Sequence, residues 1–214
     1  QHYRNMQDIE FTIQNGTLWM LQTRNGKRNG QAAIKISLEL FEDGLINLNE
    51  LSNNINPDQI EEIMHPHFHP EKEQRALILG SGLPAGPGCA IGKAVFSPEK
   101  AQAWSAKKES VILVREETSP EDIHGMHASN AIITSRGGMT SHAALVARGW
   151  GKCCVVGCGD MIIDFKSKSA SIKNQTIKEG DWISVNGTSG TIYKNKLDLI
   201  DAEIDKNKSF KELF

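Results

Sequence analysis

One stretch in the second half of the chain constrains the fold more than any other, because its residues fit a strand, a glycine turn, a helix and a second strand in succession. The β-branched run Ala131–Thr134 predicts a buried strand. The Gly137–Gly138 pair permits a tight turn that other residues rarely adopt. The apolar run Ala143–Ala147 predicts a helix of about two turns, which Gly149 ends. Cys153–Val156 then predicts a second buried strand, so this part of the chain is expected to form a layered α/β fold.

His142 lies in the first turn of this expected helix, where backbone N–H groups are unpaired and carry a partial positive charge. Such a helix start binds anions, most often phosphate. The same field disfavours a protonated imidazole, so His142 is expected to be neutral and able to accept a phosphoryl group. Thr140 or Ser141 can cap the helix, and Gly138 lets the backbone approach a bound group closely. The alternative is a surface histidine beside a helix cap.

The residues from Gly137 to Gly157, GGMTSHAALVARGWGKCCVVG, resemble the phosphohistidine motif of the pyruvate, phosphate dikinase family. The core of that motif, G-G-x-x-S/C-H-x-x-x-x-A-R, is shared with phosphoenolpyruvate synthase and with the first enzyme of the bacterial sugar phosphotransferase system. Met139 and the tail Gly149–Cys154 are more similar to the dikinase than to these relatives. The resemblance implies that the histidine carries phosphate between two remote active sites.

The resemblance also implies an α/β fold with a swivelling three-layer β/β/α phosphohistidine domain. The family reaction interconverts ATP, phosphate and pyruvate with AMP, pyrophosphate and phosphoenolpyruvate. In it, His142 attacks the β-phosphate of ATP, phosphate removes the γ-phosphoryl group as pyrophosphate, and phospho-His142 passes its group to pyruvate. The expected catalytic residues are His142, Thr140, Gly138 and Ser141. In plant members the threonine matching Thr140 is a regulatory phosphorylation site, but here we expect it to cap the helix and bind phosphate.

Residues 8–24, DIEFTIQNGTLWMLQTR, predict a β-hairpin, because apolar and polar residues alternate before the turn signal Asn15–Gly16. A two-residue loop would mix the apolar and polar faces of the two strands. We therefore expect the three-residue loop Gln14–Gly16, which pairs Phe11 with Trp19 and keeps the faces apart.

That register gathers two carboxylates, an amide and a guanidinium on one side of the hairpin, namely Asp8, Glu10, Gln22 and Arg24. Such a set can hold magnesium and nucleotide phosphates, or it can be a solvated face with a cross-strand salt bridge. The resemblance favours the first interpretation, since it makes the hairpin the last edge of an ATP-grasp domain with ATP and Mg²⁺ as cofactors. It implies that Glu10 and Gln22 line the ATP–magnesium site as metal ligands, and that Asp8 and Arg24 lie in the same site.

The resemblance divides the chain into four parts. They are residues 1–27, the C-terminal edge of the ATP-grasp domain; 28–75, an interdomain linker; 76–193, the swivelling phosphohistidine domain; and 194–214, the start of a second, helical linker. Helices are predicted within the first linker over Ala32–Phe41 and Gln59–Met64. The chain is thus expected to be an internal fragment, inactive alone. Its partners are the nucleotide and pyruvate domains of the same enzyme, which forms a homodimer through a C-terminal domain that the chain lacks.

A formal net charge of −2 gives no sign of binding to nucleic acid or to a membrane, and no apolar run is long enough to cross a bilayer. The chain holds four cysteines, Cys89, Cys153, Cys154 and Cys158, whose spacing fits neither a zinc site nor a disulfide framework. Reduced thiols are therefore expected. We expect a cytoplasmic location, with organelle targeting left open.

Two other functions remain open. Phosphoenolpyruvate synthase uses water where the dikinase uses phosphate, and a non-catalytic swivelling module would use His142 and the cysteines to hold a metal. Three basic residues near the motif either contact a phosphoryl group or are solvated, namely Arg136, Arg148 and Lys152. Three histidines, His65, His67 and His69, share a face of an extended segment but are expected to belong to the linker.

Overall fold

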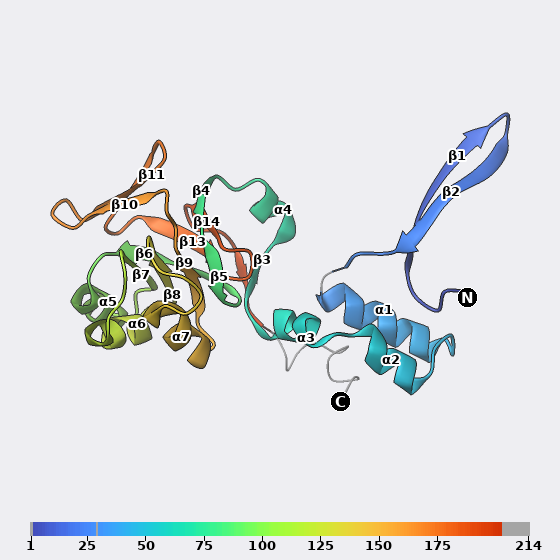
Figure 1. Ribbon diagram of the computed structural model, residues 1–214, viewed down its shortest axis with the longest axis horizontal. Helices are drawn as coiled ribbons and strands as arrows, with labels where there is room; N and C mark the ends of the chain where they lie inside the picture. Colours follow the sequence, from blue (N-terminus) through green and yellow to red (C-terminus); the bar gives the residue numbers. More distant parts are fainter. Residues whose placement is uncertain (1, 29, 203–214) are drawn as a thin grey trace. The chain divides into compact units, whose positions relative to one another are not determined.

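The computed structural model describes residues 2–28 and 30–202, which form two compact units. Of the described residues, unit 1 contains those up to Met64 together with Ala202, and unit 2 spans His65–Asp201. Figure 1 labels most of the helices and strands of both. None of the helices in the described residues is long and apolar enough to span a membrane.

Unit 1 consists of a β-hairpin and three helices. They are β1 (Gln7–Gln14), β2 (Thr17–Asn25), α1 (Gly30–Glu42), α2 (Leu48–Asn54) and α3 (Pro57–Met64). The helices pack around a small core of Ile34, Leu38, Ile46, Leu51 and Ile55. Asn47 caps α2 through a capping box, and Asn56 and Gln59 exchange hydrogen bonds at the start of α3. The helices expected over 32–41 and 59–64 are therefore confirmed.

The turn of the hairpin is shorter than expected. Strands β1 and β2 are joined by the two-residue loop Asn15–Gly16, whose φ angles are +52° and +74°. Asn-Gly adopts such a turn readily, because both residues tolerate the left-handed region. Phe11 consequently pairs with Met20. The expected three-residue loop, with Phe11 opposite Trp19, is wrong.

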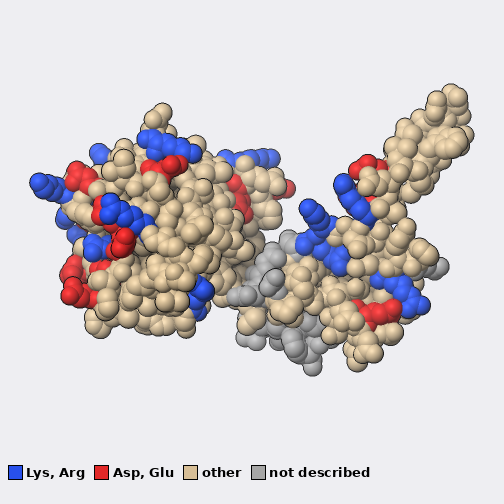
Figure 2. Space-filling model, in the orientation of Figure 1, with Lys and Arg blue, Asp and Glu red and all other residues tan. Residues whose placement is uncertain are grey.

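A β-bulge between Glu10 and Phe11 then shifts the register in the half of the hairpin away from the turn. Beyond the bulge Glu10 pairs with Gln22, and Asp8 pairs with Arg24. Directly opposite residues point to the same face of paired strands, so the polar cluster forms although the turn differs. Figure 2 shows charged side chains gathered at one end of the hairpin and an uncharged outer half.

Unit 2 alternates strands with short helices before it ends in hairpins. Its elements are β3 (His67–Phe68), α4 (Pro70–Gln74), β4 (Ile78–Ser81), β5 (Leu83–Gly86), β6 (Cys89–Val95), α5 (Pro98–Ser105), β7 (Val111–Arg115), the 3₁₀ turn η1 (Pro120–Asp122), α6 (Ile123–Ala128), β8 (Ala131–Thr134), α7 (His142–Gly149), β9 (Cys153–Val156), β10 (Met161–Asp164), β11 (Ser169–Ile172), β12 (Gln175–Lys178), β13 (Trp182–Asn186), β14 (Thr191–Lys194) and β15 (Leu199–Ile200). The strand–turn–helix–strand unit expected around His142 is confirmed as β8, α7 and β9.

The main sheet of unit 2 has eight strands in the order β4-β14-β13-β6-β7-β8-β9-β5. Its central strands β6, β7, β8 and β9 are parallel, with α5, α6 and α7 in the connections between them. Strands β4 and β5 lie at opposite ends of this order, yet only Gly82 separates them in the chain. The N–H of Gly82 donates to the carbonyl of Gly190 at 2.9 Å. The sheet therefore curls back on itself.

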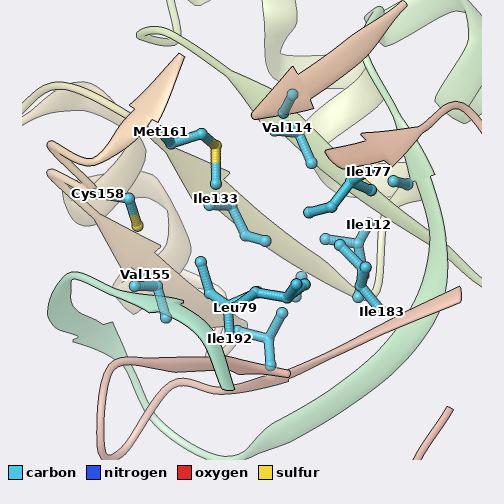
Figure 3. Packing of buried hydrophobic residues seen from close by; sticks show 14 of the residues in the cluster. Leu79, Ile112, Val114, Ile133, Val155, Cys158, Met161, Ile177, Ile183 and Ile192 are labelled. Carbon is cyan, nitrogen blue, oxygen red and sulfur yellow. The ribbon is translucent and has the colours of Figure 1, made fainter. Parts of the chain in front are cut away.

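Two hydrophobic clusters define three layers. The small sheet β10-β11-β12 covers one face of the curled sheet, and Figure 3 shows Met161 and Ile177 directed into the same core as Ile133. The helices pack on the other face through a second cluster that includes Met126 and Ala144. The α/β class expected from the sequence is confirmed. The small sheet is an addition to the elements that the sequence predicted.

Gly92 in β6 lies against the backbone of the neighbouring strand β7. A Cβ atom at this position would come within 2.8 Å of the carbonyl carbon of Val111 and 3.0 Å of its Cα. Because backbone cannot move aside as a flexible side chain can, we expect Gly92→Ala to lower the free energy of unfolding by roughly 1–3 kcal/mol. Urea unfolding of the 214-residue chain measures this loss.

Gly159→Ala is the matched control, because no atom lies within 4 Å of a Cβ at Gly159. We expect this variant to be about as stable as the parent chain. Equal losses in the two variants would contradict the close packing of β6 on β7.

Unit 2 begins earlier in the chain than residue 76, the boundary expected from the sequence. Strand β3 pairs with β15, and Phe68 packs with Tyr193. The carboxylate of Glu73 accepts hydrogen bonds from Asn186 Nδ2 at 2.7 Å and from the Tyr193 hydroxyl at 2.8 Å. Burial, with Glu73 beside it, raises the pKa of Tyr193 to about 12. These contacts attach the last residues of the expected first linker to unit 2.

The second linker, expected over residues 194–214, does not begin as the helix that was predicted. Residues 195–202 contain β15 and no helical turn. The remainder, residues 203–214, lies outside the described residues.

Candidate functional site

The loops that follow β7, β8 and β9 meet at the carboxyl edge of the parallel strands, the place where α/β sheets usually bind ligands. The loop after β8 turns at Gly137, whose φ is +97° and where a Cβ would lie 2.9 Å from that of Ser141. Gly157, after β9, has a φ of +65° and a Cβ there would lie 2.7 Å from the Gly137 carbonyl oxygen. Glycine at 157 therefore lets the loop after β9 pack against the backbone of the loop after β8, and glycine at 137 leaves room for the Ser141 side chain.

Helix α7 begins at His142, as expected, and Ser141 is its N-cap. The Ser141 Oγ accepts the N–H of Ala144 at 3.4 Å, so its own hydroxyl proton is free to donate. Thr140 is exposed and takes no part in the cap, so the capping role expected for Thr140 belongs to Ser141. No atom lies within 4 Å of a Cβ built at Gly138. The helix start and the loop before it are therefore open to a ligand.

The imidazole of His142 is half-buried and is held by a residue that the sequence motif does not contain. Thr118, in the loop after β7, places its Oγ1 3.1 Å from His142 Nδ1. With Nδ1 engaged, Nε2 is the ring nitrogen left to react. Sequence reasoning missed Thr118, because Thr118 and His142 meet only when β7 and β8 lie side by side.

The three basic residues singled out near the motif differ in position. Arg148 donates through Nη2 to the Met139 carbonyl and through Nε to the Ala144 carbonyl at 3.3 Å, so it braces the loop before α7. Arg136 is exposed, with Nη1 4.0 Å from a carboxylate oxygen of Glu116. Both arginines are exposed, and Arg148 alone has hydrogen bonds that fix its guanidinium against the start of α7.

Lys152 lies beyond the far end of α7 from His142. Its Nζ donates to the carbonyls of Met126, His127 and Ser129, at 3.2 Å to the first and 2.6 Å to the second. These are carbonyls at the C-terminal end of α6, where a cation is favoured. Burial lowers the pKa of Lys152. Lys152 therefore binds the carbonyls at the end of α6 and is not part of the His142 site.

The four polar residues of the hairpin form a second cluster. Arg24 Nε donates to Asp8 at 2.8 Å, and Arg24 Nη2 lies 3.3 Å from Glu10. Glu10 lies opposite Gln22. All four are exposed, and such salt bridges contribute little to stability, about 0–1 kcal/mol. The cluster is open to a ligand, and its ion pairs are not needed to hold the fold.

Comparisons with known proteins match both parts of the chain. Residues 107–190 match the family model described as PEP-utilising enzyme, mobile domain, and residues 1–44 match the one described as pyruvate phosphate dikinase, AMP/ATP-binding domain. Pyruvate, phosphate dikinase 1, chloroplastic, from Arabidopsis thaliana is 48% identical over 196 residues. Pyruvate, phosphate dikinase 2 from Zea mays is 47% identical over 195 residues. The chain belongs to the pyruvate, phosphate dikinase family.

The chain spans about a fifth of the length of these dikinases. The matches cover 92% of the chain and 20% of the Arabidopsis protein, and 91% of the chain and 22% of the maize protein. Among solved structures, the NMR solution structure of Enzyme I (nEIt) matches with a TM-score of 0.31 and 27% identity, over 49% of this chain and 37% of that one. A score this low supports no argument about the fold.

The hairpin cluster lies within the stretch that matches the dikinase AMP/ATP-binding domain. A carboxylate and an amide oxygen, from the facing pair Glu10 and Gln22, are the hard oxygen donors that Mg²⁺ takes, usually together with nucleotide phosphates and water. Two such ligands suit a shared metal–nucleotide site. The residues therefore fit Mg²⁺ by the chemistry of their donor atoms.

The four cysteines are free and buried, which agrees with the expectation of reduced thiols. Burial raises the pKa of Cys89, Cys154 and Cys158 to about 12, which disfavours the thiolate that a metal needs. No group of three or more His, Cys, Asp or Glu that could hold a metal occurs among residues 2–28 and 30–202. Nothing in that part of the chain favours the alternative of a metal-binding module.

Proposed function

We propose that the chain is the carrier segment of a pyruvate, phosphate dikinase, with His142 as the phosphoryl carrier. The observation that carries the proposal is the position of His142 at an open helix start, with Nδ1 held by Thr118 and Nε2 left to react. Matches to the dikinase ATP-binding domain and to the mobile domain of PEP-utilising enzymes support both halves of the reaction.

In this proposal each residue of the site has a part in phosphoryl transfer. When Nδ1–H donates to Thr118, the lone pair of Nε2 is the nucleophile. The start of α7 stabilises the negative charge of the phosphoryl oxygens. The hydroxyls of Ser141 and Thr140 and the backbone N–H of Gly138 are the further donors to those oxygens. In the pyruvate site the methyl group of pyruvate loses a proton, and the enolate oxygen takes the phosphoryl group from Nε2, which gives phosphoenolpyruvate and neutral His142.

The hairpin serves the ATP half of the reaction. Glu10 and Gln22 would hold Mg²⁺, which neutralises charge on the nucleotide phosphates when bound. Arg24, which Asp8 orients, would pair with a phosphate oxygen. A two-stranded hairpin alone is marginally stable, and apolar residues such as Phe11 and Leu21 are exposed on this one. Both points support a hairpin that completes a larger nucleotide-binding domain.

The carrier must visit two sites, one that holds ATP and one that holds pyruvate. We therefore propose that unit 2, a β/β/α domain, swivels between the nucleotide and pyruvate domains of one enzyme. The 214-residue chain holds too little of either site to enclose a substrate, since ligand pockets bury most of their ligand. We expect it to have no dikinase activity alone. We further propose that the whole enzyme dimerises through its C-terminal domain. Its proposed location is the cytoplasm or an organelle.

Product analysis tests the reaction. A full-length enzyme that carries this segment should convert ATP, phosphate and pyruvate to AMP, pyrophosphate and phosphoenolpyruvate, with pyrophosphate formed in equal amounts with AMP. Inorganic phosphate released from ATP without pyrophosphate would instead show the phosphoenolpyruvate synthase reaction. The dikinase names of the relatives in the comparisons favour the first outcome.

A further inference from the structure

The hydrogen bond between Thr118 and His142 comes from a loop whose backbone is fixed at its start, where the Glu116 carbonyl accepts the N–H of Arg136 at 2.9 Å. Residues 116–119 follow β7, and both Glu117 and Ser119 are exposed. Exposed loops are the more mobile parts of a domain, whereas a hydrogen bond weakens steeply when its geometry drifts. Another contact must hold the loop if Thr118 Oγ1 is to stay 3.1 Å from His142 Nδ1.

Asp122 provides this contact from the interior. Among the described residues it is the one charged residue that is buried, with only 4% of the residue exposed. Its Oδ2 accepts the N–H of Ser119 at 2.8 Å and the Ser119 hydroxyl at 3.4 Å. Hydrogen bonds from backbone N–H to a carboxylate are stronger than neutral ones. Because Ser119 follows Thr118 directly, Asp122 sets the direction of the backbone that carries the Thr118 hydroxyl.

Arg115 in turn holds the Asp122 carboxylate. Its Nη2 lies 3.3 Å from Asp122 Oδ1, and its Nη1 donates to the Phe96 carbonyl at 3.3 Å. The guanidinium carbon lies 5.3 Å from the centre of the Phe165 ring, in the turn between β10 and β11. Arg115 is thus attached both to the end of β6 and to the small sheet. A buried carboxylate without a partner is costly, and Arg115 offsets that cost.

We infer that Arg115 and Asp122 are positioning residues for His142. Through Ser119 and Thr118 they hold the imidazole with Nδ1 toward Thr118 and Nε2 toward the open side of the site. The effect on the imidazole follows from these contacts alone, whereas its consequence for phosphoryl transfer rests on the proposed function. Misplacement of a reacting group by about 1 Å can cost roughly a hundredfold in rate. A loosened loop should slow phosphorylation of His142 about tenfold, with little change in KM for phosphoenolpyruvate.

The first experiment compares Asp122→Asn with Glu121→Gln, which removes an exposed carboxylate from the same turn. ¹⁵N NMR of the 214-residue chain reports which nitrogen of the His142 ring carries the proton. We expect the Nδ1–H tautomer in the parent chain and in Glu121→Gln, and a mixture of tautomers in Asp122→Asn. Thr118→Val should give the same mixture, while Thr118→Ser should keep the parent tautomer. An unchanged tautomer in folded Asp122→Asn overturns the inference.

Arg115→Lys provides a second variant should Asp122→Asn fail to fold, since it keeps the charge and loses the guanidinium fork. It should move the tautomer in the same direction, and an unchanged ratio again overturns the inference. Phosphorylation of the full-length variants by phosphoenolpyruvate then separates the two proposals. A shifted tautomer in an enzyme that never phosphorylates His142 refutes the proposed function and leaves the inference standing. Phosphorylation of folded Asp122→Asn at the parental rate, together with an unchanged tautomer, refutes the inference and leaves the proposed function standing.

Discussion

Replacement of His142 by alanine should abolish both phosphoenzyme formation and net turnover in a full-length enzyme that carries this segment. The substitution removes the nucleophile, and no other group in the described site can take its place at the start of α7. Unit 2 should stay folded, because alanine is the best helix former and the substitution removes one hydrogen bond, that to Thr118, worth about 1 kcal/mol.

Transfer of ³²P from phosphoenolpyruvate and a thermal unfolding curve together measure this result. His124→Ala is the matched control, because His124 is a histidine on α6, outside the His142 site, and should be dispensable. Normal turnover by a folded His142→Ala enzyme would show that the phosphoryl carrier is another residue.

The hairpin variants Glu10→Ala and Arg24→Ala should separate the two halves of the reaction. We expect phosphorylation of His142 by ATP to fall about a hundredfold or more, since Glu10 would hold the Mg²⁺ that neutralises the nucleotide phosphates and Arg24 would pair with one of their oxygens. Phosphorylation by phosphoenolpyruvate should remain near the parental rate, because the hairpin belongs to only one of the two sites. Both residues are exposed, so neither change should unfold the hairpin.

Isotope exchange measured separately for the ATP half and the pyruvate half tests this separation. Gln14→Ala, at the turn end of the same hairpin, is the control and should leave both halves unchanged. Equal loss of both halves in Glu10→Ala would mean that the hairpin has a structural role or belongs to a shared site.

The hairpin shows which features of a structure a local sequence pattern can predict and which it cannot. Separation of apolar from polar residues correctly placed Asp8, Glu10, Gln22 and Arg24 on one face, but it chose the wrong loop. In the structure Asn15–Gly16 forms its preferred two-residue turn. The bulge between Glu10 and Phe11 then returns the four polar side chains to one face. A bulge inserts one residue and reverses the period-two phase just as a three-residue loop does, so the sequence alone could not distinguish the two solutions.

The sequence likewise predicted some residues of the His142 site and missed others. The motif predicted the glycine turn, the helix start and the histidine, because these lie within a few consecutive residues and follow local rules. Thr118, Asp122 and Arg115 come from a different loop and strand, and only the pairing of β7 with β8 brings them to the site. Residues brought together by long-range pairing carry no local signal.

The small sheet β10-β11-β12 was missed for a different reason. Its strands have four residues each, which is too short for alternation to stand out from chance. Lys168 and Lys173, at two of its turns, have positive φ angles of 50° and 54°. Lysine gives none of the turn signal that glycine or asparagine would give. The layer therefore becomes visible only as packing, through side chains such as Met161.

The central claim is that His142 carries the phosphoryl group on Nε2. The most direct test is to phosphorylate the full-length enzyme with [³²P]phosphoenolpyruvate, and in parallel with [β-³²P]ATP and phosphate, and then to map the label. Both donors should give an acid-labile, base-stable phosphate on the peptide that contains His142, with ³¹P and ¹⁵N NMR placing it on Nε2. Label on Thr140, on another histidine, or on Nδ1 of His142 would contradict the account.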